Sequence, residues 1–266
     1  MKLRKVLAVS AALVMALTAF TGCGSNSSAP ADSASAPAEN GTYRIVTDTT
    51  FAPFEFTNDK GEFVGIDVDL LDAIAKDQGF EYQLDSIGFD SALTAVDSGQ
   101  ADGFIAGASI TEERQLKFDF SDKYYDSTVC AAVKADNAAA SLDDIKGSAV
   151  AVKTGTMSAK WAESIADEYG LTLTYYDDSA MMYDAVNSGS AVACFEDFPV
   201  MAYGVSQNNG MKLLVEEDGP DFATPYGFGV KKGENAELLA MFNAGLKNIQ
   251  ENGTYDEILA KYTSAE

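Results

Sequence analysis

The 266-residue sequence contains no histidine, three cysteines, one tryptophan and three arginines. Without histidine, nucleophilic catalysis of the Ser-His or Cys-His kind is excluded. The same shortage leaves no Cys/His cluster for zinc, so we predict neither a metal nor a cofactor. Because nearly all other cations are lysines, the arginine at position 114 stands out as a residue chosen for more than its charge.

Basic residues are also scarce, with 18 Lys and Arg against 41 Asp and Glu, a formal net charge of -23. Nucleic-acid binding needs basic patches, so this balance argues against a nucleic-acid partner. It also argues against attraction to an anionic membrane surface. The acidity names no partner by itself and most simply keeps a soluble surface hydrated. With 47% apolar residues, the chain can bury a sizeable core.

The N-terminus has the features of a targeting segment. Residues 1–22 combine the basic "MKLRK" with the apolar "VLAVSAALVMALTAF", the pattern of a secretory signal peptide, and "TGCG" follows. This ending resembles a bacterial lipoprotein signal, which would make Cys23 an acylated N-terminus; an ordinary signal with a chance Cys is the alternative. Residues 23–42 are rich in Ser, Ala and Pro and predict a flexible tether. We therefore expect a protein anchored at Cys23 on the extracytoplasmic face of the cell membrane.

From residue 43 onward, strand-like and helix-like segments alternate, which predicts an α/β fold with mostly parallel sheets flanked by helices. The helix predicted within 65–80 places Val68, Leu71, Ile74 and Ala75 on its apolar face and ends at Gly79. Residues 95–106, "AVDSGQADGFIA", and 185–196, "AVNSGSAVACFE", share one order of helix end, Gly cap and buried strand. This repetition indicates two lobes of similar build, with a cleft between them as a natural ligand site.

Two cysteines lie within this region, Cys130 in "STVCAAV" and Cys194 in "SAVACF". Two cysteines in an exported chain can form a disulfide. Both runs are apolar and strand-like, so buried free thiols are an equally good interpretation.

Arg114 ends the stretch "GASITEER", where small residues separate a buried strand from a helix start. Free N–H groups at a helix start favour an anion, and the planar guanidinium can clamp a carboxylate with two hydrogen bonds. The alternative is a surface arginine paired with Glu112 or Glu113. The stretch "VKTGTMS" is a second turn of this kind, where Thr156 and the Met157 N–H can bind the same carboxylate.

A zwitterionic ligand also needs an acid. "CFEDFP" offers Glu196 and Asp197 at the end of a buried strand, either to bind an α-ammonium group or, for Asp197, to cap the next helix. Asp48 and Phe51 follow the first strand, and Phe89 follows another. Aromatic residues at such places are usually core, but facing a cleft they can stack on a ligand.

Six segments in order along residues 43–262 carry a family resemblance: "TDTTFAPFEF", "GEFVGIDVDLLDAIAK", "AGASITEERQLKFDFSDKYY", "VAVKTGT", "EDFPVMAY" and "ENGTYDEILAKY". They resemble the amino-acid-binding proteins of bacterial ABC importers, solute-binding protein family 3, with the two-lobed type II periplasmic-binding fold. The resemblance implies lobe 1 at 43–126 and 225–266, lobe 2 at 129–221, and crossings near 124–128 and 222–226.

The resemblance also implies roles for the matching positions. The ligand α-carboxylate would be held by Arg114, Ser109, Thr156 and the backbone of Met157. The α-ammonium would be held by Asp197, with backbone groups from Ala106 and Gly107. The ligand side chain would lie between Phe51 and Phe89, with Asp48 and Lys153 at its far end.

The implied function is that of a non-enzymatic, monomeric receptor that binds a free L-amino acid and delivers it to ABC transporter permease subunits in the membrane. Asp48 and Lys153 together favour a neutral carboxamide, so we expect glutamine first. Glu196, as an extra acid, favours arginine or another basic residue second. The alternative is an enzyme of the same fold, a cyclohexadienyl dehydratase, for which Glu196 is the one candidate acid.

Overall fold

The computed structural model describes residues 41–217, 222 and 225–263. The predicted signal peptide, Cys23 and the tether up to residue 40 lie outside the described residues, as does part of the second predicted crossing. Across the stretches that are described, no helix combines the length and the apolar character needed to cross a membrane.

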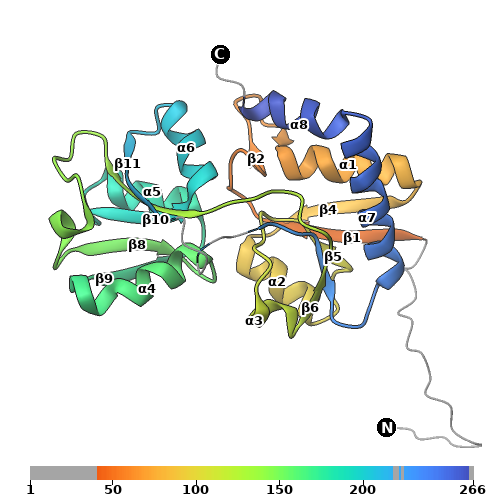
Figure 1. The fold of residues 1–266 in the computed structure, drawn as a ribbon, viewed down its shortest axis with the longest axis horizontal. Helices are drawn as coiled ribbons and strands as arrows, with labels where there is room; N and C mark the ends of the chain where they lie inside the picture. The colour runs from red at the N-terminus through yellow and green to blue at the C-terminus, as the bar shows by residue number, and fades with distance from the viewer. Residues whose placement is uncertain (1–40, 218–221, 223–224, 264–266) are drawn as a thin grey trace, which may run out of the picture. The chain divides into compact units, whose positions relative to one another are not determined.

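The described residues build two five-stranded sheets (Figure 1). The first has the order β4-β1-β5-β12-β6, with β1 Thr42–Thr47, β4 Glu81–Ser86, β5 Gly103–Phe104, β6 Phe118–Phe120 and β12 Gly229–Lys231. The second has the order β11-β7-β10-β8-β9, with β7 Val129–Lys134, β8 Ala149–Lys153, β9 Thr172–Tyr176, β10 Ala193–Asp197 and β11 Met211–Glu217. A two-stranded sheet pairs β2 Phe56–Thr57 with β3 Phe63–Val64.

Helices flank each sheet. Around the first sheet lie α1 Ile66–Gln78, α2 Phe89–Asp97, α3 Glu112–Gln115, α7 Ala236–Glu251 and α8 Thr254–Thr263. Around the second lie the 3₁₀ turn η1 Leu142–Ile145 and the helices α4 Met157–Tyr169, α5 Ser179–Asn187 and α6 Phe198–Ser206. The α/β fold predicted from the alternating pattern is confirmed.

The pairing within each sheet differs from the prediction of mostly parallel strands. In the first sheet β1 is parallel to β4 and β5, whereas β12 is antiparallel to β5 and β6. In the second, β8 is parallel to β9 and β10, whereas β7 is antiparallel to β10 and β11. Parallel neighbours need a helical crossover within one sheet. Because β7 and β12 enter their sheets from the other sheet, they are free to run antiparallel.

The two similar sequence stretches adopt the same local structure. In each, a helix (α2 or α5) ends at a Ser, a Gly follows with positive φ, 74° at Gly99 and 80° at Gly189, and a strand (β5 or β10) begins. The backbone N–H groups of Ala101 and Ala191 donate to equivalent helix carbonyls at 3.2 and 3.0 Å. β5 is only two residues long, shorter than predicted. β5 therefore leads into the segment 105–109, whereas β10 continues through Glu196 and Asp197.

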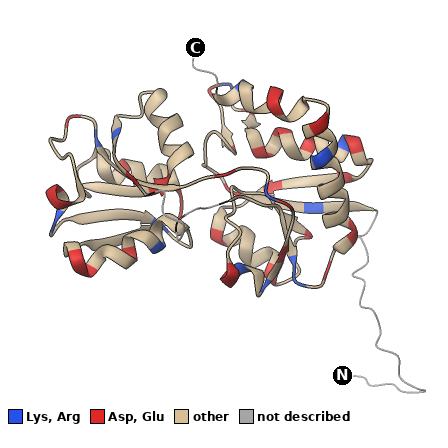
Figure 2. Cartoon of the chain, in the orientation of Figure 1, with Lys and Arg blue, Asp and Glu red and all other residues tan. Residues whose placement is uncertain are grey.

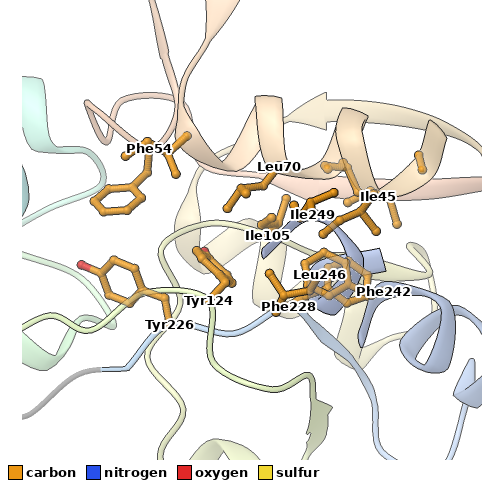
Figure 3. Packing of buried hydrophobic residues seen from close by; sticks show 14 of the residues in the cluster. Ile45, Phe54, Leu70, Ile105, Tyr124, Tyr226, Phe228, Phe242, Leu246 and Ile249 are labelled. Atoms are coloured by element: carbon orange, nitrogen blue, oxygen red, sulfur yellow. The ribbon is translucent and has the colours of Figure 1, made fainter. Parts of the chain in front are cut away.

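We call the first sheet with its helices the first lobe, and the second sheet with its helices the second lobe. The core of the first lobe lies between its sheet and helices α1 and α7, where Ile45, Leu70, Phe228 and Phe242 are packed (Figure 3). The predicted α1 face is wrong at Val68, which is only half-buried. The buried stripe instead begins at Ile66 and continues through Leu70 and Ile74, because the helix starts at Ile66 and residues four apart share a face. Gly79 ends the helix in the left-handed conformation, as predicted.

Both cysteines of the second lobe, Cys130 and Cys194, are buried free thiols in its core. Burial raises the pKa of each thiol well above its usual range, which keeps them unreactive. Acidic residues are spread along the helices and loops around both sheets (Figure 2), in keeping with a hydrated acidic surface.

Candidate ligand-binding site

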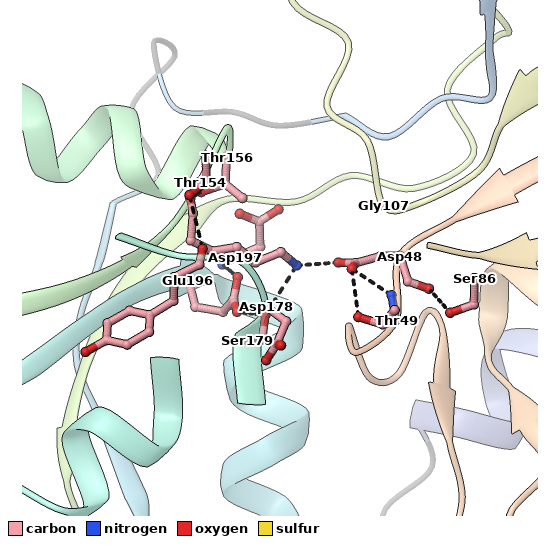
Figure 4. A network of polar contacts seen from close by, with 12 residues as sticks. Asp48, Thr49, Ser86, Gly107, Thr154, Thr156, Asp178, Ser179, Glu196 and Asp197 are labelled. Atoms are coloured by element: carbon pink, nitrogen blue, oxygen red, sulfur yellow. Dashed lines mark hydrogen bonds and ion pairs between the residues drawn. The ribbon is translucent and has the colours of Figure 1, made fainter. Parts of the chain in front are cut away.

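An ion pair between Asp48 and Lys153 joins the two lobes. Asp48 follows β1 in the first sheet, and Lys153 is the last residue of β8 in the second. Both side chains are buried, at 0% and 1% exposure. Figure 4 shows the polar network around Asp48. Burial alone would lower the pKa of Lys153, but the charges of Asp48 and Glu196 outweigh it and raise that pKa. Lys153 therefore stays cationic at neutral pH inside the protein.

The Lys153 ammonium also lies over two aromatic rings, 4.5 Å from the centroid of Phe51 and 5.7 Å from that of Phe89. These are the two rings predicted to enclose the ligand side chain. Ring faces attract cations, and a carboxylate at the same place adds to that attraction. The structure thus gathers four of the predicted residues at one point between the lobes.

Arg114 lies in α3 and turns toward the second lobe. Its guanidinium donates hydrogen bonds to the carbonyl oxygens of Ser109 (2.7 Å) and Gly155 (2.9 Å), and its Cζ lies 5.1 Å from the Phe89 centroid. The alternative of a surface pair with Glu113 is wrong, because Glu113 pairs with Lys160. Burial lowers the pKa of Arg114 to about 10, so it remains cationic at neutral pH.

Two helix starts lie near this guanidinium. Thr111 caps α3 by accepting from the Arg114 N–H at 3.2 Å, and Thr156 caps α4 by accepting from the Ala159 N–H at 3.1 Å. Met157 is the first residue of α4, so its N–H has no partner within the helix and can bind an anion. The Thr156 hydroxyl also donates to the carbonyl of Lys153. The sequence did not show that the Thr156 hydroxyl is already used to cap α4 and to bond to Lys153.

The backbone groups predicted at Ala106 and Gly107 are placed differently. Gly107 adopts φ 52°, and its N–H points into the first lobe and donates to Asp67 at 2.8 Å. A Cβ at this position would lie 2.3 Å from the Phe51 ring, so only glycine fits. The Gly107 N–H is therefore already used within the first lobe.

Asp197 ends β10 and is 4% exposed. It occupies the N-cap position of α6, but its carboxylate accepts from the Tyr226 hydroxyl (2.5 Å) and the Ser158 hydroxyl (3.2 Å) instead. Burial, and then the charge of Glu196, raise its pKa to about 7. An ammonium group beside this carboxylate would favour the ionised form.

Glu196 is held inside the second lobe. One carboxylate oxygen accepts from the Asp197 N–H at 2.9 Å, and the other accepts from the hydroxyls of Ser179 (2.8 Å) and Tyr183 (2.9 Å). Three donors fix its orientation, so it is poorly placed to act as a general acid. Ser158, Ser179, Tyr183 and Tyr226 were not predicted, because nothing in their local sequence distinguishes them.

A separate cavity of about 970 Å³ lies elsewhere between the lobes. It is lined by the strand connection 125–128, by residues of α6 and by Lys261 and Tyr262 of α8. Its lining contains none of the residues predicted to hold the ligand, so the candidate site is distinct from it.

Comparison with known proteins agrees with this architecture. The model of the bacterial extracellular solute-binding proteins, family 3, matches residues 43–265. The chain belongs to this family.

Individual relatives are also similar to this chain over most of its length. A probable histidine-binding protein of Neisseria gonorrhoeae is 32% identical over 97% of this chain and 96% of its own length. Two structures of an ancestral arginine-binding protein, one bound to arginine and one to glutamine, are each 36% identical with a TM-score of 0.76. They cover 84% and 85% of this chain and 99% of theirs. These relatives are named as binding proteins rather than as enzymes.

Proposed function

We propose that the chain is the extracytoplasmic substrate-binding component of an amino-acid ABC importer. The observation that carries this is the opposition of Arg114 and Asp197 across the two lobes. Asp197 is the strongest of the charges that act on the Arg114 guanidinium, yet each group is bonded to other partners. A zwitterion between them would bring its carboxylate to Arg114 and its ammonium to Asp197.

Binding by residues of both lobes explains how such a receptor signals occupancy. A ligand that contacts Arg114 on one lobe and Asp197 on the other stabilises only the arrangement in which both contacts exist. Permease subunits can then recognise that arrangement and accept the amino acid. The lobe boundaries 43–126 with 225–266 and 129–221 belong to this proposal.

The ligand is proposed to be a polar L-amino acid, glutamine first and arginine or another basic residue second. Asp48 can accept from a carboxamide NH₂ while Lys153 donates to its carbonyl. One structure of an ancestral arginine-binding protein is bound to arginine and another is bound to glutamine, which supports this pair of candidates. Titration calorimetry of the purified protein with the set of L-amino acids tests the order. Binding of only acidic or only apolar amino acids would overturn it.

Replacing Lys153 with Met should change the preference. The variant keeps Asp48 and Glu196 without their cation, so a basic side chain gains relative to a carboxamide. We expect the ratio of arginine to glutamine affinity to rise by about 10-fold or more. Calorimetry with both amino acids measures this, and Lys146→Met, an exposed lysine that pairs with Asp143, is the matched control. An unchanged ratio would show that Lys153 does not face the ligand side chain.

The anchor is proposed from the sequence of residues 1–42, with Cys23 as the acylated residue. Cys23→Ser should move the protein from the membrane to the soluble fraction of cells and abolish incorporation of labelled palmitate. If the variant remained membrane-bound and labelled, acylation at Cys23 would be wrong.

A further inference from the structure

Two carboxyl groups lie buried beneath the candidate site in the first lobe. Glu55 is paired with Phe51 by a backbone bridge, and Asp67 is the second residue of α1. The Asp67 N–H donates to the carbonyl of Phe54, the neighbour of Glu55, at 2.9 Å. Both are 0% exposed. Among the described residues, neither oxygen of Glu55 has a hydrogen-bond donor, and Oδ1 of Asp67 lacks one as well. The cation that acts on Glu55 is Lys153, which is itself bonded to Asp48.

Two ionised carboxylates side by side in a dry interior would repel each other with nothing to offset the loss of water. One shared proton removes this conflict, because a protonated carboxyl can donate to its ionised neighbour. Burial, followed by the charges of Asp67 and Asp48, raises the pKa of Glu55 well above its usual range. Burial raises the pKa of Asp67 only to about 6, because hydrogen bonds from the Gly107 N–H and the Tyr124 hydroxyl lower it.

We propose that Glu55 carries a proton at neutral pH, donates it in a hydrogen bond to Asp67, and through this pair positions the ligand-binding loops of the first lobe. Asp67 Oδ2 accepts from the Gly107 N–H and from the Tyr124 hydroxyl, each at 2.8 Å. The Phe51 N–H donates to the Glu55 carbonyl at 2.7 Å. The pair thus connects the loop of Phe51 to the loop that leads to Ser109.

Three titratable groups face the pair: Asp48 from the end of β1, Lys153 from β8 and Tyr124 from the segment after β6. Each acid of the pair also faces the other from its own element. The charge of Asp48 favours the protonated form of Glu55 and the charge of Lys153 opposes it. Since those two are bonded to each other, their effects on Glu55 largely cancel. Proximity to Asp67 and burial then decide where the proton lies.

The proton is tested without any ligand. With the side-chain carboxyl carbons of Glu labelled with ¹³C, the Glu55 signal is assigned by its loss in Glu55→Gln. We expect it to titrate at least about two pH units above the exposed Glu81, which serves as the reference. Titration of both together in the ordinary carboxyl range would overturn the shared proton.

The positioning role rests on the proposed function and is tested separately. Glutamine and methionine are close to glutamate in volume, but only glutamine can donate to Asp67. We expect Glu55→Gln to keep the amino-acid affinity within about threefold and Glu55→Met to lose about 10-fold or more. Equal affinities of the two variants would reject positioning by the hydrogen bond.

If Glu55→Met does not fold, a loss of more than tenfold in folded Glu55→Gln would reject the positioning role. If no amino acid binds the parent protein, the proposed function fails while the titration still decides the proton.

Discussion

Arg114→Lys is expected to weaken binding of the preferred amino acid by about 1.5–3 kcal/mol, which is about 10- to 150-fold. Arg114 has five N–H donors and uses two of its nitrogens on the carbonyls of Ser109 and Gly155. Its remaining N–H groups can bind a carboxylate while these two bonds hold the side chain. Lysine keeps the charge but has neither the planar fork nor enough donors for both tasks.

Calorimetry of the variant measures this loss. Arg44→Lys is the matched control, because Arg44 pairs with Asp85 at the far edge of the first sheet. We expect the control to bind as the parent protein does. If Arg114→Lys bound every amino acid as tightly as the parent, Arg114 would not hold the carboxylate.

Asp197→Asn is expected to weaken binding by about 2–4 kcal/mol, because the ligand ammonium loses its one charged partner in a buried place. The parent should also show a pH dependence that this variant lacks. The pKa of Asp197 is about 7, and a bound ammonium would lower it. Below about pH 7, binding must then release a proton, so the affinity should fall by up to about tenfold for each unit by which the pH is lowered. The exposed Asp184→Asn is the matched control.

A measurement of stability distinguishes a loss of ligand binding in Asp197→Asn from a loss of folding. The pKa of Asp197 in the folded protein is raised above its ordinary value, so its contribution to stability is present in full at acidic pH and is lost as pH rises through about 7. Asparagine has no such loss, and we expect Asp197→Asn to be at least as stable as the parent at about pH 8. A variant that bound normally at every pH would show that Asp197 does not hold the ammonium.

Local features of the fold could be predicted because they depend on neighbours in sequence. The helix end at Gly79 follows from residue type after an amphipathic run. The antiparallel pairing of β7 and β12 could not, because it depends on how the chain passes between the two sheets. The burial of Asp67 could not be predicted either, since no local signal in the sequence shows it.

The candidate site, too, could be predicted from the sequence only in part. Asp48 follows a strand and Lys153 and Asp197 end strands, where ligand-binding residues of α/β proteins gather. Arg114 lies in the short helix after another strand. Family order then indicated their roles, which remain proposals. Tyr226, which donates to Asp197, comes from the returning chain 29 residues later, and only the folded structure brings it there.

The central claim is that the site recognises both charged groups of an amino acid. The most direct test is calorimetry with glutamine and arginine beside analogues that lack either the α-carboxylate or the α-ammonium group. We predict that at least one of the two L-amino acids binds with one ligand per protein, and that each of its analogues binds about 100-fold more weakly or worse. Analogues that bind as well as the intact amino acid, or an absence of binding by any L-amino acid, would contradict the account.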